Sequence, residues 1–490
     1  MEKQPSIKLN FLYNISYQIL LVISPLIVAP YISRVLGDAN IGTYSYTYSM
    51  AQYFSALCAL GVNNHGNRTI SVCRDDPKKL SSTFSEITTL KFLIAAFVLT
   101  AYCLYAGFVA DESYRVYSFL QLFYILSIVL DLHWFFAGLE KFKITVMRLF
   151  IIKVLSTICI FLFVKKETDL MLYTLIMSGS FLISELYLWF VARKYVKWSM
   201  PKWKDMMGHL KPMLILFIPI LAVDLYRMMD KIMLGEMVSM NSVGQYENAE
   251  KIIKICLCVV TALSSVMLPR MAKLSAENDV ATMRKYHGNS MKVILALACA
   301  LAGGILAVGK PFAPMFFGVE FVECGYVLEI LAVSVLLIAW SNMVRTQYLI
   351  PCHRDRVYII SVWCGVAVNL VLNLLLIPKF SAMGAAIATV ITEFVVCVVQ
   401  TIYSWKDLPM DVFFRNLIAY GAIAAVMFAA VKAMTLLPLS GALLLVVQVA
   451  VGAFVYLALA FVYLWFSDRA MVLSALKGVK KILKKLHLVH

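Results

Sequence analysis

The sequence predicts an all-α integral membrane protein with about fourteen transmembrane helices, arranged as two six-helix lobes, two additional helices and an amphipathic C-terminal helix. Of its 490 residues, 62% are hydrophobic and only 15% are charged, and a water-soluble protein could not bury so large an apolar excess. Apolar runs of about 20 residues recur along the whole chain, and a helix needs this length to cross about 30 Å of hydrocarbon. A segment in the first half is also repeated in the second half.

Each apolar run is interpreted as one membrane-spanning helix. The first run is too long for a cleaved signal peptide, lacks a small-residue cleavage site and leads straight into the second run. In chain order, the predicted helices occupy residues 11–33, 41–61, 84–109, 114–138, 144–164, 170–192, 212–234, 243–268, 290–317, 326–350, 357–378, 383–404, 412–436 and 441–466.

The formal charge of +16 indicates orientation rather than a nucleic-acid partner. Most of the 44 Lys and Arg residues lie at one end of the predicted helices, which are joined there by the longer loops. Because cytoplasmic loops of membrane proteins carry an excess of Lys and Arg, this asymmetry predicts that both termini are cytoplasmic.

No spacing of residues predicts catalysis, a cofactor or a metal site. The eleven cysteines are scattered, mostly inside apolar runs, and the seven histidines form no metal-binding pattern. The cysteines are therefore interpreted as small apolar core residues. There is no nucleotide-binding glycine motif, so we expect a protein that is not an enzyme.

The repeated segment reads "PYISRVLGDANIGTYSY" at 30–46 and "DKIMLGEMVSMNSVGQYENAEK" at 230–251. In both copies a Leu-Gly pair is followed by a second glycine and, two residues later, a tyrosine. The copies lie about 200 residues, or six predicted helices, apart, so the lobes would be parallel repeats of the kind known in transporters. We predict lobes at 1–205 and 206–405 and two further helices at 406–466; a chance match is the alternative.

The C-terminal segment 467–490 differs from the rest of the chain. One helical stripe is apolar and the remaining positions are rich in lysine, which predicts an amphipathic helix on an anionic cytoplasmic leaflet. The alternative is a solvated basic tail.

Charged residues interrupt the predicted helix 212–234. Asp224, Arg227 and Lys231 share one helix face, and Asp230 flanks it. Each intramembrane charge costs at least about 2.5 kcal/mol on insertion scales, so such residues usually face a bundle interior or a wet cavity. Alternatively, the acids and bases only neutralise one another, and Lys231 reaches the membrane surface.

Further charges lie in other predicted helices. Lys251 and Lys254 are one turn apart and could approach one phosphate group, and Arg34 lies near the outer end of the first helix. These bases could instead extend to the surface. Glu185 and Glu393 are isolated carboxyls, interpreted either as protonatable coupling sites or as neutral, hydrogen-bonded acids.

Three prolines predict bends in equivalent helices of the two lobes. Pro25 and Pro30 lie in the first predicted helix and Pro219 in the seventh. Each removes a backbone hydrogen bond from its helix, so these positions are candidate hinges.

The first copy with its continuation, "PYISRVLGDANIGTYSYTYSMAQYFSALCALGVNNHGNRTIS", resembles the opening of the Wzx-type polysaccharide repeat-unit flippases. The second copy and "NLLLIPKFSAMGAAIATVITE" (373–393) resemble second-lobe segments of that family. The resemblance covers nearly the whole chain and implies the multidrug/oligosaccharidyl-lipid/polysaccharide exporter fold. It implies a bacterial plasma-membrane protein that moves undecaprenyl-pyrophosphate-linked oligosaccharides for polymers such as O-antigen or capsule.

The implied partners are this lipid-linked oligosaccharide, membrane lipids, and the polymerase and chain-length proteins of the same pathway. No cofactor is expected, although H⁺ or Na⁺ are candidate coupling ions. A cationic, water-filled cavity would be needed for the pyrophosphate, and Arg34, Arg227, Lys231, Lys251 and Lys254 are the basic residues expected to line it. One alternative is a cation-coupled multidrug exporter of the same fold, which typically has an acidic residue in the first helix; residues 11–37 contain none. The alternative from another class is a membrane glycosyltransferase or polymerase.

Overall fold

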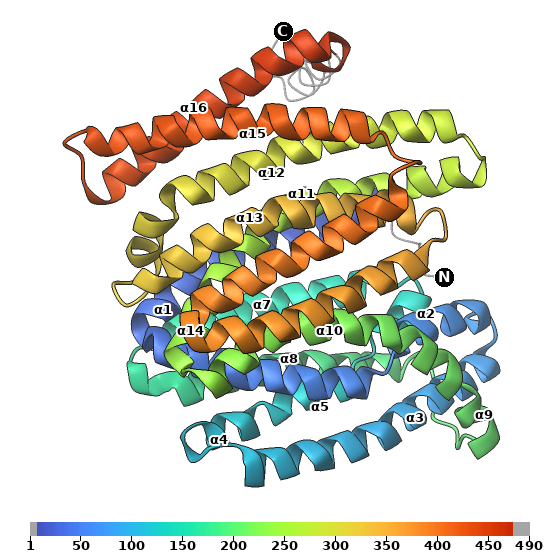
Figure 1. The fold of residues 1–490 in the computed structure, drawn as a ribbon. Coiled ribbons are helices and arrows are strands. Elements are labelled where there is room, and N and C mark those ends of the chain that lie inside the picture. The colour runs from blue at the N-terminus through green and yellow to red at the C-terminus, as the bar shows by residue number, and fades with distance from the viewer. Residues whose placement is uncertain (1–6, 474–490) are drawn as a thin grey trace. The chain divides into compact units, whose positions relative to one another are not determined.

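The structure is a computed structural model that describes the backbone of residues 7–473 and the side chains of residues 23–218 and 221–473. Within the described backbone every regular element is a helix (Figure 1). The elements are α1 (Ile7–Ala59), α2 (Val62–Cys73), α3 (Pro77–Leu104), η1 (Tyr105–Val109), α4 (Glu112–Leu120), α5 (Leu122–Leu130), α6 (His133–Gly138), α7 (Phe142–Phe163), η2 (Glu167–Asp169), α8 (Leu170–Ala192), α9 (Trp203–Gly208), α10 (Leu210–Met237), α11 (Met240–Ala276), α12 (Val280–Phe317), α13 (Val322–Val344), η3 (Arg345–Leu349), α14 (Asp355–Ser404), α15 (Met410–Ala433), η4 (Met434–Leu436) and α16 (Gly441–Ser467).

The predicted all-helical membrane fold is confirmed. Among the described residues, ten helices are long and apolar enough to cross a membrane, and there are eleven if the bent pair Trp203–Ile218 and Leu221–Met237 is one span. All fourteen predicted ranges fall on helices, with two ranges in α1 and two in α14. These helices are consistent with about fourteen spans.

The two longest helices each change direction at one residue between two predicted spans. In α1 this residue is Gly37, whose φ of 76° suits glycine because it has no Cβ. In α14 it is Ser381, with φ 53°. Pro25 and Pro30 lie inside α1, before Gly37. The segments on either side of Pro219 meet at 52°. The role of the three prolines as hinges stays a prediction.

The chain forms two compact units. The first contains residues 1–251, 317–321 and 365–388, and the second contains residues 252–316, 322–364 and 389–490. The lobe boundaries expected near residues 205 and 405 stay predictions.

Apolar side chains fill the interior of each unit and also cover much of its surface. In the first unit, Trp134 and Phe135 are buried and pack against Phe84, with ring centroids 5.9 and 4.9 Å from its ring. By contrast, Phe108 at the end of the span that contains α3 and Phe466 at the end of α16 are both 84% exposed. Such large exposed apolar groups suit a surface that faces lipid.

The predicted amphipathic tail falls mostly outside the described residues. Residues 469–473 are helical, and residues 474–490 lie beyond the part that the structure describes.

Candidate functional site

The two copies of the repeated segment cross each other inside the first unit. A Cβ atom added to Gly42 on α1 would lie 1.7 Å from the carbonyl oxygen of Met240 on α11. A Cβ atom added to Gly244 on α11 would lie 2.0 Å from the carbonyl oxygen of Asp38 on α1. Because no side chain fits at either glycine, the two backbones approach closely at this point, which we call the glycine crossing.

Polar side chains join the two helices around the glycine crossing. The Asp38 carboxylate accepts hydrogen bonds from the amides of Asn241 and Gln245, both at 2.8 Å. Further along α11, the Asn248 amide donates to the hydroxyl of Ser33 at 2.7 Å. The Asn248–Ser33 hydrogen bond is buried, so it favours one register of α11 on α1, because a shift would leave the Asn248 amide unsatisfied in an apolar environment.

Lys231 lies at the centre of a charged cluster beside the crossing. Its ammonium group is 2.9 Å from Glu247 Oε2 and 3.2 Å from Glu250 Oε2. The Lys231 side chain is only 7% exposed, and each glutamate is 16% exposed. Glu247 also forms an ion pair with Lys251 at 3.4 Å and accepts a hydrogen bond from Ser45 Oγ at 2.8 Å.

Asp230, the residue before Lys231, is buried among neutral donors. Its carboxylate accepts hydrogen bonds from Tyr246 Oη at 2.7 Å, Asn369 Nδ2 at 3.0 Å and Asn373 Nδ2 at 2.6 Å. The two asparagines are one turn apart on α14, so both amides reach the same carboxylate. These hydrogen bonds give the buried carboxyl oxygens of Asp230 polar partners.

The cluster is therefore mixed in charge rather than simply cationic. Asp230, Glu247 and Glu250 are acidic, and Lys231 and Lys251 are basic, so the five side chains carry a formal charge of −1. Lys231, predicted as a pyrophosphate ligand, is enclosed by two carboxylates. Exclusion of water strengthens these attractions, and loss of one partner would leave a buried charge.

The other predicted cationic residues are more accessible than Lys231. Arg34, Arg227 and Lys254 are exposed, while Lys251 is partly buried. Arg34 lies against Gly318, where an added Cβ would be 3.3 Å from Arg34 Cγ. Their assignment to a substrate stays a prediction.

The remaining predicted acidic residues have different surroundings. Asp224 on α10 is partly buried. Glu185 on α8 forms an ion pair with Arg148 on α7, with 2.6 Å between Oε1 and Nη1. Glu393 on α14, in the second unit, is 6% exposed.

Sequence reasoning missed Asn369 and Asn373 as partners of Asp230, and Arg148 as the partner of Glu185. A signal for the first pair was present, because two amides four residues apart interrupt an otherwise apolar run. For Arg148 the signal was obscured, because its position near the start of a predicted helix suggested a loop-facing base. Among the described residues, no group of three or more His, Cys, Asp or Glu side chains could hold a metal ion.

The chain is similar in sequence to a protein family and to a curated protein that both concern polysaccharides. A family model described as "Polysaccharide biosynthesis protein" matches residues 7–275. The chain is 23% identical over 376 residues to a putative O-antigen transporter of Shigella dysenteriae, and the match covers 75% of this chain and 92% of that protein.

Two solved structures show the same fold. The lipid II flippase MurJ, in an inward closed conformation, matches with a TM-score of 0.71 at 13% identity, over 93% of this chain and 98% of that one. An inward-facing multidrug resistance MATE family transporter of the MOP superfamily matches with a TM-score of 0.58 at 14% identity, over 79% and 97% of the two chains. The chain thus has the fold of these two proteins.

Proposed function

The chain belongs to the polysaccharide biosynthesis protein family, and on that premise we propose that it is a flippase for lipid-linked oligosaccharides. Its substrate would be an undecaprenyl-pyrophosphate-linked repeat unit, moved from the cytoplasmic to the outer face of the plasma membrane by alternating access. The relative in Shigella dysenteriae is described as a putative O-antigen transporter, which supports this substrate class. A hydrated pyrophosphate cannot cross hydrocarbon unaided, so the chain must supply polar groups inside the membrane.

The observation that carries this proposal is the buried charged cluster on α10 and α11. Membrane-spanning helices rarely contain ionisable residues unless they line a pathway or pair with one another. Here the innermost base, Lys231, is paired with Glu247 and Glu250. We assign Lys231 to holding the two helices together, with its charge balanced by the two carboxylates.

We assign contact with the pyrophosphate to the more accessible bases Arg34, Arg227, Lys251 and Lys254. Arg227 is exposed and lies one helical turn from the buried Lys231. A guanidinium group binds phosphate oxygens with two parallel hydrogen bonds, which a single ammonium group cannot reproduce.

Transport is proposed to be coupled to H⁺ or Na⁺, with Asp230 as the coupling carboxylate. In the first unit, the Asp230 carboxylate accepts hydrogen bonds from the neutral side chains of Tyr246, Asn369 and Asn373. Asp224 is treated as the partner of Arg227, and Glu185 as a structural partner of Arg148. Glu393, buried in the second unit, remains a second coupling candidate. Measuring transport with Na⁺ replaced by K⁺ at constant pH would distinguish the two ions.

A cation-coupled multidrug exporter is the second candidate, because the MATE structure shares the fold. A multidrug exporter would lower the accumulation of cationic dyes in cells, whereas a flippase would restore surface polysaccharide to a flippase-deficient strain. The proposed partners of the flippase are membrane lipids and the polymerase and chain-length proteins that act after translocation.

The test is complementation of a strain that lacks its own repeat-unit flippase. Arg227→Ala is expected to abolish surface polysaccharide at near-normal protein abundance, while Arg227→Lys retains part of it. If Arg227 only neutralises Asp224, Arg227→Ala should instead reduce folded protein, and Asp224→Ala/Arg227→Ala should restore both abundance and polysaccharide. That second pattern would remove Arg227 from the proposed binding site.

The proposed orientation, with both termini cytoplasmic, is tested by labelling single cysteines in a Cys-less background. Cysteines at positions 165–168 and 237–242 should react with an impermeant reagent from outside the cell. Cysteines at positions 75–79 and 200–204 should react only after permeabilisation. The reverse pattern would contradict the orientation.

A further inference from the structure

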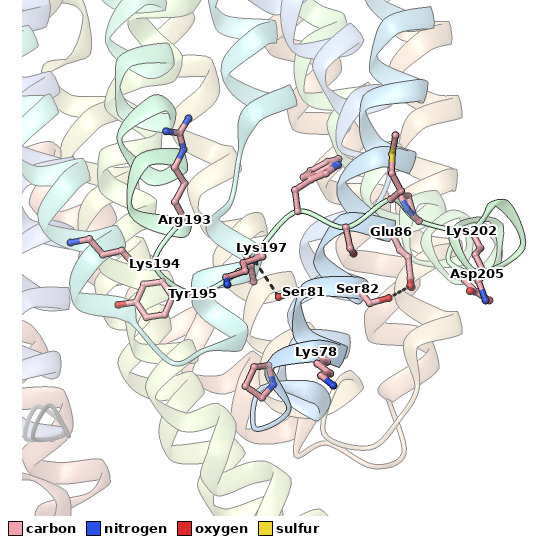
Figure 2. A pocket seen from close by; sticks show the side chains of 16 residues that line it. Lys78, Ser81, Ser82, Glu86, Arg193, Lys194, Tyr195, Lys197, Lys202 and Asp205 are labelled. Carbon is pink, nitrogen blue, oxygen red and sulfur yellow. Dashed lines mark hydrogen bonds between the residues drawn. The ribbon is translucent and has the colours of Figure 1, made fainter.

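A basic pocket, separate from the charged cluster, lies between the start of α3 and the segment that joins α8 to α9 (Figure 2). Its volume is about 720 Å³. Five basic side chains line it, against two acidic ones, Glu86 and Asp205. The basic residues are Lys78, Arg193, Lys194, Lys197 and Lys202.

One of the two acidic residues, Glu86, already interacts with neighbouring side chains. Glu86 Oε1 accepts a hydrogen bond from Ser82 Oγ at 2.5 Å, and Glu86 Oε2 lies 3.1 Å from Nε2 of His209. Asp205, the other acid, is exposed on α9. The excess of positive side chains favours an anion in this pocket.

Hydrogen bonds to α3 hold the wall of the pocket in place. The backbone N–H of Lys197 donates to Ser81 Oγ at 3.2 Å, and that of Ser199 donates to Ser85 Oγ at 3.0 Å. The extended segment 196–202 is thus fastened along the first turns of α3. The Asp76 carboxylate already caps the first N–H groups of α3, so lysine and arginine side chains would hold a bound anion.

Large apolar side chains of the same segment, and of the start of α9 that follows it, are exposed. Trp198 is 50% exposed, Met200 91% and Trp203 68%. The pocket also lies where membrane-spanning helices end, since α8 ends at Ala192 and α3 begins at Pro77. Tryptophan and lysine together are typical of the membrane interface, where indole rings lie at headgroup level and ammonium groups meet lipid phosphates.

We propose that this pocket binds the phosphate headgroup of an anionic bilayer lipid on the face predicted to be cytoplasmic. The basic residues that line the pocket, Lys197 and Lys202 among them, supply the positive charge that attracts the phosphate. Trp198, Met200 and Trp203 enter the boundary between headgroups and acyl chains. A soluble phosphate would satisfy the lysines but would leave these three apolar side chains in water. The lipid anchors the segment between α8 and α9, and the assignment does not depend on what the protein transports.

The experiment measures lipid bound to the purified full-length chain by native mass spectrometry. The probes are dioctanoyl phosphatidylglycerol, dioctanoyl phosphatidylcholine and inorganic phosphate. The pocket variant is Lys197→Ala/Lys202→Ala. The matched control is Lys204→Ala/Lys211→Ala, which removes the same charge from two exposed lysines that do not line the pocket. Lys197→Arg/Lys202→Arg keeps the charge, and gel filtration checks that every variant is folded.

Binding of phosphatidylglycerol is expected to fall about tenfold or more in the pocket variant, since each lysine near an anionic surface contributes roughly 1 kcal/mol. The control and the arginine variant should bind within about twofold of the parent, and phosphatidylcholine should bind weakly to all of them. An equal loss in the pocket and control variants would show diffuse attraction and overturn the proposal. If inorganic phosphate at the same concentration competes with phosphatidylglycerol, the pocket binds a soluble anion and the proposal is wrong. The proposal is also wrong if the pocket variant misfolds and the arginine variant fails to bind lipid.

Discussion

The two copies of the repeated segment share a backbone contact and differ in side-chain chemistry. Gly42 and Gly244 occupy equivalent places at the glycine crossing, and each lies against the backbone of the other copy. Ser45 and Glu247 are 202 residues apart, as are the two glycines, and they hydrogen-bond to each other. The first copy thus supplies a neutral hydroxyl where the second supplies a carboxylate. The repeated feature is a close helix crossing, and the buried charges belong to the second copy.

Removing the carboxylate partners of Lys231, which belong to the second copy, should reduce the amount of folded protein more than any other substitution proposed below. The variant Glu247→Gln/Glu250→Gln leaves a lysine that is 7% exposed without carboxylate partners. Loss of the partners of a buried charge typically costs about 3–5 kcal/mol. We therefore expect little folded protein, measured as the monodisperse fraction in detergent.

A third substitution removes the buried base as well as its two carboxylate partners. Lys231→Met in the same background removes the buried charge, so the yield of folded protein should recover while transport stays lost. Full yield of Glu247→Gln/Glu250→Gln without Lys231→Met would contradict the assignment of Lys231 as a buried, charge-balanced residue.

Substitution of either crossing glycine should have a smaller but clear effect, equal in the two copies. Gly42→Ala and Gly244→Ala each place a methyl group within 2.0 Å of a carbonyl oxygen, which forces the backbones apart. Overpacking of this kind costs about 1–3 kcal/mol, and we expect a matching fall in Tm. Gly179→Ala on α8 is the control, because nothing lies within 4 Å of its added Cβ. If Tm is unchanged in only one of the two crossing-glycine variants, the contact is not symmetric.

The smallest expected effect depends on pH and lies outside both copies. On α2, His65 Nε2 is 2.8 Å from His209 Nδ1, and burial, then the neighbouring His209 and Arg68, lower the pKa of His65 below 6.5. A lowered pKa means that the unfolded chain binds the proton more readily, so this contribution to stability is present above pH 6.5 and lost as the pH falls below it. We expect less than about 1 kcal/mol, because the group is only partly buried.

The measurement for this effect is Tm between pH 5 and pH 8 for the parent and for His65→Gln. The parent should lose stability on the acid side, and His65→Gln should lose less. If Tm depends on pH in the same way in both proteins, protonation of His65 does not contribute to the difference in stability between the folded and unfolded chain. The stabilities of the glycine variants could then be compared without regard to pH.

The fold class could be predicted because its signal is local and repeated many times. Each apolar run is long enough to span a bilayer by itself, whatever its neighbours are. The two Leu-Gly motifs were also visible, since glycine and tyrosine at matching places stand out in an apolar sequence. The places where α1 and α14 turn were less visible, and only one of the two turning residues, Gly37, is a glycine.

The candidate site could be predicted only in part. The sequence indicated that Asp230 and Lys231 were unusual, because charge within an apolar run is rare. One of its two interpretations let the acids and bases of this helix neutralise one another, since neighbours along one helix are the only partners that spacing reveals. In the structure, Lys231 has Glu247 and Glu250 from α11, and Asp230 has Asn369 and Asn373 from α14.

Hydrophobic length and residue identity act within single helices, so they were enough to predict a membrane-spanning helical protein with a repeated segment. The pairing of the charges and the contact between Gly42 and Gly244 became visible only in the packing of the helices. The ion pairs of Lys231 join α10 to α11 across 16 and 19 positions, whereas Gly42 and Gly244 are 202 positions apart. Both contacts depend on how α1, α10 and α11 rotate about their axes and on the kink at Gly37. A helix pattern shows which residues share a face, and packing alone selects the partner that each face receives.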